Sequence, residues 1–214
     1  MLGLLVCLLA ARVVFAQTGV ITYESRVNLH RNIPADRQEM KAMVPEFRIT
    51  KFSLSYNEEE SLYKTIVEDE EEQFSSGGGA VRMTMRIPKT EMYTNSSTTA
   101  ILSVQELMGK KYLIQDSVKV SPWKFGTETK EVKGYVCRQA TFFNEERKQN
   151  IVAWYTDKLR PFLGPESFNT LPGGVLEVDI NDGERVITAQ AIELRPLKKN
   201  EIKIMYSFSY NYNL

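Results

Sequence analysis

Regular alternation of apolar and polar side chains, interrupted by short turns, is the feature that most limits the folds open to this chain. The clearest example is a hairpin in which residues 134–143 and 151–156 flank the polar turn 144–150. Other alternating segments lie at 20–29, 47–55, 61–67, 81–86, 99–104, 112–118, 175–180, 185–194 and 202–214. Most connections are too short for parallel crossovers, so the sequence predicts an all-β fold with about ten strands. The expected architecture is a single antiparallel, strongly curved sheet, or a barrel or half-barrel.

Three segments depart from this alternation. Pro34 and Pro45 bracket residues 34–43, which predicts one short helix. The run Ser-Val-Gln-Glu at 103–106 fits a helical capping box, but the β-branched and aromatic residues around it favour a hairpin through residues 108–110. The acidic and glycine-rich stretch 68–80 predicts a solvated loop.

The first sixteen residues have the character of a signal peptide. They are almost all apolar, with Arg12 as the single charge, and they end in Val-Phe-Ala before Gln17. We therefore expect a signal peptide at 1–16, with cleavage after Ala16, and a single β-rich domain at 17–214. No second apolar run of about 18 residues follows, so we expect no transmembrane span after cleavage. The expected location is the periplasm, the outer membrane surface or the exterior.

Composition restricts the chemistry open to the protein. The 27 Lys and Arg residues balance the 27 Asp and Glu residues, which argues against a nucleic-acid partner. His30 is the single histidine, and Cys7 and Cys137 are the two cysteines, so most zinc sites and most nucleophile–histidine pairs are excluded. We expect no metal, no cofactor and no catalytic residue. Cleavage would leave Cys137 as a lone thiol, which we expect to be buried, unpaired and unreactive.

A constellation of residues in the C-terminal half resembles the GLPGLI family, small exported proteins typical of the Bacteroidota. The chain reads W-K-F-G-T-E-T-K-E-V-K-G-Y-V-C from residue 123, A-W-Y-T from residue 153 and G-P-E-S-F-N-T-L-P-G-G from residue 164. Thr170 and Gly174 depart from the family's pattern. The resemblance implies a β-rich exported protein and carries no established activity. The matching residues are Trp123, Gly134, Tyr135, Cys137, Ala153, Trp154, Tyr155, Thr156, Gly164, Pro165, Phe168, Leu171, Pro172 and Gly173.

These matching residues have two interpretations. In the first they are a folding motif, with Gly-Pro and Leu-Pro-Gly turns, a positive φ at Gly173, packed aromatic rings and a buried cysteine. In the second, Trp154 or Tyr155 lines the mouth of a ligand cavity together with Phe168. Turns need glycine and proline, and cores commonly contain cysteine and aromatic residues. This favours the interpretation as a folding motif.

Three classes of function follow, in order of preference. The first is a non-enzymatic binding or carrier module of the cell envelope, whose apolar interior holds a hydrophobic small molecule or a lipid-like ligand. The second is a structural component of an outer-membrane complex, which contacts an envelope protein partner through the aromatic strand 202–214. A hydrolase ranks third, because the acids Asp157, Glu166, Glu177 and Asp179 show no spacing that selects a pair.

Overall fold

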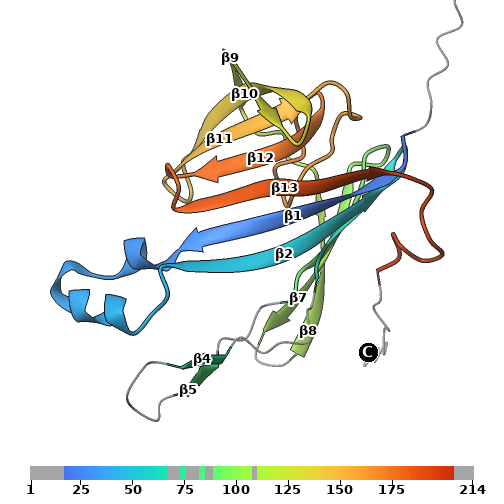
Figure 1. Cartoon of the computed structure of the whole chain (residues 1–214). Helices are drawn as coiled ribbons and strands as arrows, with labels where there is room; N and C mark the ends of the chain where they lie inside the picture. The colour runs from blue at the N-terminus through green and yellow to red at the C-terminus, as the bar shows by residue number, and fades with distance from the viewer. Residues whose placement is uncertain (1–16, 67–72, 76–81, 85–88, 108–109, 205–214) are drawn as a thin grey trace, which may run out of the picture.

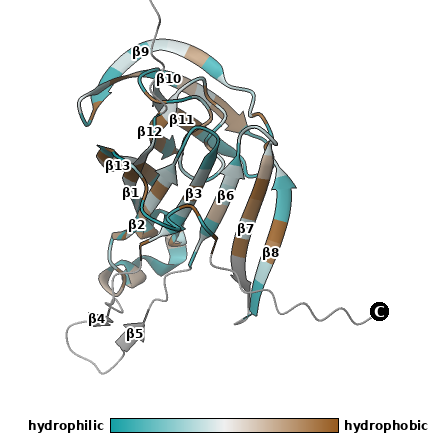
Figure 2. Cartoon of the chain, turned by 90° about the vertical axis from the view of Figure 1, so that its right-hand side faces the viewer, coloured by the Kyte–Doolittle hydropathy of each residue, from teal (hydrophilic) through white to brown (hydrophobic). Residues whose placement is uncertain are grey.

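The computed structural model describes residues 17–66, 73–75, 82–84, 89–107 and 110–204. Eleven of its strands form one antiparallel sheet, which curls strongly but does not close (Figures 1 and 2). The strands follow the order β8-β7-β6-β3-β2-β1-β13-β12-β11-β10-β9, and a separate short ribbon pairs β4 with β5. The predicted all-β class, antiparallel pairing and strong curvature are therefore confirmed.

The sheet is built from hairpins on either side of β1 and β13. The N-terminal half contributes β1 (Gly19–Asn28), β2 (Phe47–Tyr56), β3 (Glu60–Thr65), β6 (Glu91–Asn95), β7 (Ala100–Leu107) and β8 (Lys110–Ser117). The C-terminal half contributes β9 (Lys124–Val132), β10 (Tyr135–Asn144), β11 (Gln149–Thr156), β12 (Gly174–Ile180) and β13 (Arg185–Leu194). The small ribbon consists of β4 (Gln73–Ser75) and β5 (Arg82–Thr84). Pairing of β1 with β13 joins the halves, with Tyr23 opposite Ala189 and Ser25 opposite Ile187.

Side-chain alternation gives this sheet two different faces. Ile21 and Tyr23 of β1 point to the inner face, where Leu54, Tyr63 and Ile187 also lie almost fully buried. Glu24 and Arg26 point to the outer face. Cross-strand partners share a face, but register shifts at Thr22/Tyr23, Arg138/Ala140 and Trp154/Tyr155 interrupt the alternation.

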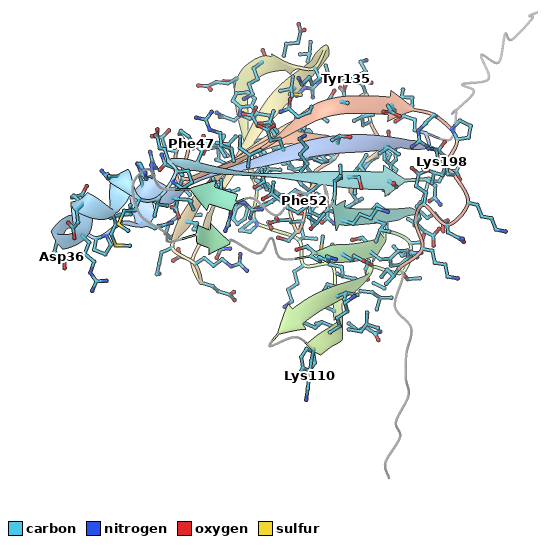
Figure 3. All side chains as sticks on the ribbon, turned by 60° about the horizontal axis from the view of Figure 1, so that its bottom comes forward. Asp36, Phe47, Phe52, Lys110, Tyr135 and Lys198 are labelled. Carbon is cyan, nitrogen blue, oxygen red and sulfur yellow. The ribbon has the colours of Figure 1, made fainter. Side chains whose placement is uncertain are left out.

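The predicted helix is a 3₁₀ segment. Two short pieces, η1 (Leu29–Asn32) and η2 (Ala35–Ala42), connect β1 to β2, and neither contains a buried residue. Figure 3 shows them extending beyond the sheet, with Asp36 far from the strands. These two pieces therefore bury no apolar face. Burial of such a face is what usually stabilises an α-helix.

Two predicted strand segments have different outcomes in the structure. The hairpin expected through residues 108–110 is confirmed by the pairing of β7 with β8, although residues 108 and 109 lie outside the described part of the chain. The strand predicted at 202–214 is wrong where it can be assessed, because residues 202–204 form no strand and 205–214 lie outside the description. Within the described ranges, no helix is long and apolar enough to cross a membrane.

Candidate functional site

The inner face of the sheet is filled by the chain itself. The connection between β11 and β12, residues 157–173, folds onto this face and is called here the inner loop. Leu159, Leu163 and Leu171 are at most 2% exposed. The loop is tied to the sheet because the backbone N–H of Val175 donates to the carbonyl of Leu163 at 2.8 Å, while the hydroxyl of Tyr23 donates to the carbonyl of Val175 at 2.6 Å.

Most of the residues singled out in the sequence belong to this packing. Gly164, Pro165, Phe168, Leu171 and Gly173 are buried parts of the inner loop. Pro172, also in the inner loop, is exposed. Cys137, Ala153, Tyr155 and Thr156 are buried in β10 and β11, and Cys137 is a free thiol as predicted.

The remaining predicted residues have distinct surroundings. Trp123 precedes β9, donates its indole N–H to the Thr170 hydroxyl at 3.0 Å and packs edge-on against Phe142. Tyr135 packs half-buried against the core, while Gly134 forms the β9–β10 turn with a φ of +82°. Trp154, which also packs half-buried against the core, lines a hollow on the face of the sheet that it shares with Lys130 and Glu177.

Two adjoining hollows on the outer face form what we call the Trp154 trough. Their volumes are about 510 and 460 Å³. Register places them side by side, since Trp154 is opposite Glu177, Glu177 is opposite Thr188, and Thr188 is opposite Glu24. At a strand spacing of about 4.8 Å, the row from β11 to β1 spans roughly 14 Å. The lining residues are Glu24, Arg26, Asn28, Phe47, Lys130, Asn150, Val152, Trp154, Glu177, Asp179, Asn181, Asp182, Gly183, Val186, Thr188 and Gln190.

Charged side chains hold one end of the trough in place. Lys130, on the edge strand β9, forms an ion pair with Glu177, and its ammonium nitrogen lies 4.6 Å from the centroid of the Trp154 ring. The other carboxylate oxygen of Glu177 accepts from the Thr188 hydroxyl at 3.3 Å. The indole is thereby fixed as the apolar end of a polar hollow.

The turn beside the trough is also held by hydrogen bonds. The backbone N–H of Gly183 donates to Asp179 at 2.6 Å, and the guanidinium of Arg31 donates to the carbonyl of Asn181 at 2.6 Å. The Asn150 backbone N–H donates to the side-chain oxygen of Asn181 at 2.9 Å. At the opposite end, Arg26 lies 3.6 Å over the ring of Phe47. The trough thus has an aromatic ring at each end and planar polar groups between them.

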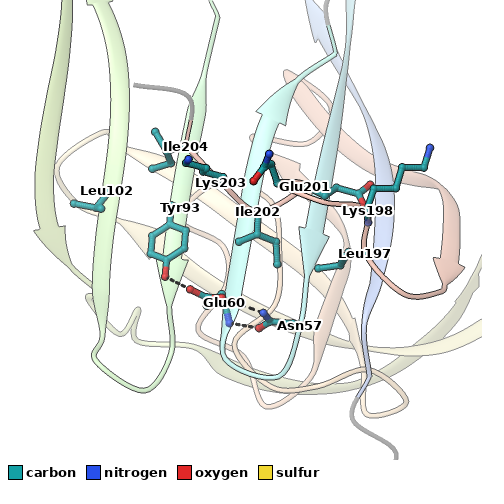
Figure 4. A pocket seen from close by; sticks show the side chains of 11 residues that line it. Asn57, Glu60, Tyr93, Leu102, Leu197, Lys198, Glu201, Ile202, Lys203 and Ile204 are labelled. Atoms are coloured by element: carbon teal, nitrogen blue, oxygen red, sulfur yellow. Dashed lines mark hydrogen bonds between the residues drawn. The ribbon is translucent and has the colours of Figure 1, made fainter. Parts of the chain in front are cut away.

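A third hollow lies further along the outer face (Figure 4). The segment after β13 crosses β3, β6 and β7 and leaves a pocket of about 570 Å³. Glu60 accepts hydrogen bonds from the Tyr93 hydroxyl at 2.5 Å and the Asn57 amide at 3.0 Å, which lower the pKa of its carboxyl. Glu201 is bound by Arg195 at 2.7 Å, so both carboxylates are already satisfied inside the protein. The pocket is lined by Asn57, Glu60, Tyr93, Leu102, Leu197, Lys198, Asn200, Glu201, Ile202, Lys203 and Ile204.

The described residues contain no group of three or more side chains able to hold a metal ion. The four acids considered for hydrolysis lie in three different places. Glu177 and Asp179 lie on the outer face, Glu166 pairs with Arg185 on the inner side, and Asp157 pairs with Arg138 on the surface at 3.2 Å. These four acids form no common cleft. The outer-face trough is therefore the better candidate for a binding surface.

Comparison with known proteins identifies relatives of this fold. A family model described as "N-glycanase peptide, N-terminal domain" matches residues 51–212. Two solved structures of PNGF-II, in different crystal forms, have TM-scores of 0.56 and 0.55 and are 16% identical to the chain. They match 87% of this chain but 29% and 30% of their own length, so the chain spans less than a third of either. No curated protein matches.

The family match overturns two predictions. The resemblance to the GLPGLI family is wrong, because the model that matches is that of the N-glycanase N-terminal domain. Most of the glycine, proline and aromatic residues that suggested it pack the inner loop, so their role is in the fold. The preferred functions, a carrier or an outer-membrane component, are also wrong, since the family model that matches is that of an N-glycanase domain. The predicted apolar interior is occupied by Leu163, Phe168 and Leu171.

Proposed function

The chain belongs to the family of the N-glycanase N-terminal domain, and from this premise we propose that it serves an N-glycanase-type hydrolase by holding the saccharide of its substrate. The match over residues 51–212 carries the proposal, because it relates the domain to an enzyme named for its action on N-glycans. The Trp154 trough is the proposed contact surface.

The chemistry of the trough supports a saccharide as its ligand. A sugar presents apolar C–H faces and many hydroxyl groups, so it needs an aromatic surface together with planar polar partners. Trp154 and Phe47 provide rings, while Asn150, Asn181 and Asp179 provide amide and carboxylate groups between them. Hydrogen bonds from the surrounding turns fix several of these groups, which reduces the entropy lost on binding.

A titration of the purified protein tests this function. The probe is a short peptide with a core oligosaccharide on its asparagine, and the control is the same peptide without the sugar. We expect the glycopeptide alone to bind, with amide chemical shifts changing in β11 to β13. Trp154→Ala should weaken binding at least tenfold, which corresponds to about 1.4 kcal/mol. Trp123→Phe, which alters the inner-loop packing, should leave the affinity unchanged. Equal binding of both peptides, or full binding by the Trp154 variant, would contradict the proposal.

We further propose that the protein is exported, as the apolar segment 1–16 indicates. Mass spectrometry of the mature protein from its host should give a chain that begins at Gln17. Recovery of a chain that begins at Met1 would show that the segment is retained.

A further inference from the structure

The cations that line the Trp154 trough are already committed to partners within the protein. The Lys130 ammonium is shared between Glu177 and the Trp154 ring. The Arg26 guanidinium lies 3.6 Å over the Phe47 ring. Among the described lining residues these two are the only cationic side chains, so the trough has little positive charge left to offer a ligand.

Acceptor groups, in contrast, are in surplus. Four carboxylates line the trough, namely those of Glu24, Glu177, Asp179 and Asp182, against the two cations. Asp179 uses one oxygen for the N–H of Gly183, and Asp182 is an exposed residue at the tip of the β12–β13 turn. A ligand that enters the trough therefore meets oxygen acceptors and a net negative charge.

We infer that the Trp154 trough selects uncharged, hydroxyl-rich saccharides and rejects saccharides that carry a carboxylate, sulfate or phosphate group. Hydroxyl donors would form charge-assisted hydrogen bonds with Asp179 and Asp182. An anionic group would bring like charges together and leave these acceptors without donors, and such unfavourable contacts are an effective source of specificity. The inference rests on the proposed saccharide-binding function and adds the charge class of the ligand.

The experiment compares two glycopeptides that differ only in the terminal sugar, which is neutral in one and carries a carboxylate in the other. Calorimetric titration at low ionic strength should give at least tenfold tighter binding of the neutral probe. The Asp179→Asn/Asp182→Asn variant should reduce this ratio to less than about threefold, mainly by improving the acidic probe. Asparagine keeps the acceptor for the Gly183 N–H and tolerates the positive φ of 53° at residue 182, so we expect the variant to fold. Asp182→Asn alone provides a milder second test.

Asp116→Asn is the matched control, because it removes an exposed carboxylate on β8, away from the trough. It should leave the ratio at its wild-type value. Equal affinity for both probes, lost in Trp154→Ala, would overturn the charge selection while supporting the saccharide site. A ratio that the double variant leaves unchanged would likewise overturn the assignment to Asp179 and Asp182. Failure of both probes to bind would overturn the proposed function itself.

Discussion

At the scale of single residues, close approach rather than backbone conformation explains the glycine of the Leu-Pro-Gly turn. The sequence predicts a positive φ at Gly173, and this is wrong, since among the described glycines the positive values are those of Gly134 and Gly183. A Cβ atom built on Gly173 would instead lie 2.2 Å from the carbonyl oxygen of Thr156 and 2.8 Å from its carbonyl carbon. Both contacts are with backbone, which cannot rotate away as a side chain can.

This contact predicts a large effect from one methyl group. Gly173→Ala should lower the free energy of unfolding by about 1–3 kcal/mol, the usual cost of overpacking a buried site. The measurement is urea denaturation followed by circular dichroism. Gly126→Ala is the control, because its nearest contact is the movable side-chain oxygen of Gln139, and it should cost much less. Equal stability of the Gly173 variant and the wild type would contradict the close packing.

At the scale of elements, an ion pair fastens the inner loop to the sheet. Arg185 of β13 forms a two-pronged ion pair with Glu166 and donates to the Ser25 hydroxyl at 3.0 Å. Each member of the pair is 27% exposed, so water screens it less than a fully exposed pair. The loop itself presents Leu163 and Phe168 to the core, and the pair holds one of its turns in place.

Removal of this pair should loosen the inner loop selectively. We expect Glu166→Gln to lower the free energy of unfolding by about 1–2 kcal/mol, since it removes a charge-assisted contact from a partly buried arginine. Hydrogen exchange should accelerate at the amides of Phe168 and Val175 more than at those of β1. Asp157→Asn, which breaks the exposed pair with Arg138, should change stability by less than about 0.5 kcal/mol. Equal effects of the two variants would show that the Glu166 pair does not fasten the loop.

The strands could be predicted from the sequence wherever one face is buried and the other is not. In β1, β10 and β13, apolar and polar side chains alternate because one face of the strand is more buried than the other. Prediction from alternation failed for β9, an edge strand whose side chains are exposed along most of its length. It also failed for the short β6. The inner loop was also missed, because turn residues indicate where a chain bends and not what the bent segment covers.

The candidate site was less accessible to prediction for a topological reason. Trp154 was singled out, but its neighbours across the outer face come from distant parts of the chain. Glu24 of β1 and Thr188 of β13 become adjacent only through the strand order of the finished sheet. Alternating polar positions were visible on each strand, whereas a single sequence contains no signal that pairs them.

At the scale of the whole molecule, curling of the sheet around the inner loop buries several weakly acidic groups together. Burial raises the pKa of the Cys137 thiol to about 11 and that of Tyr56 to about 12, and it also raises the pKa values of Tyr23 and Tyr63. The cause is the same in each case, because the low-polarity interior disfavours the anion. These four groups come from strands of both halves, so their titration reports on the core as a unit.

The stability of the fold should therefore fall in alkali. A group whose pKa is higher in the folded state favours folding fully below its unfolded pKa, and this contribution is lost as pH rises through the folded value. We expect the urea midpoint to be constant at neutral pH and to fall from about pH 9 upward, as unfolded cysteine and tyrosine begin to ionise. Tyr56→Phe should reduce the steepness of this fall, because it removes one of the groups whose pKa is raised in the folded state. Tyr112→Phe, at a residue that is 47% exposed, is the control and should leave the slope unchanged. Phenolate absorbance then separates the possibilities: tyrosines that all ionise near pH 10 in the native protein would show that the interior admits water, whereas ionisation delayed until unfolding would show that the inner loop keeps it out.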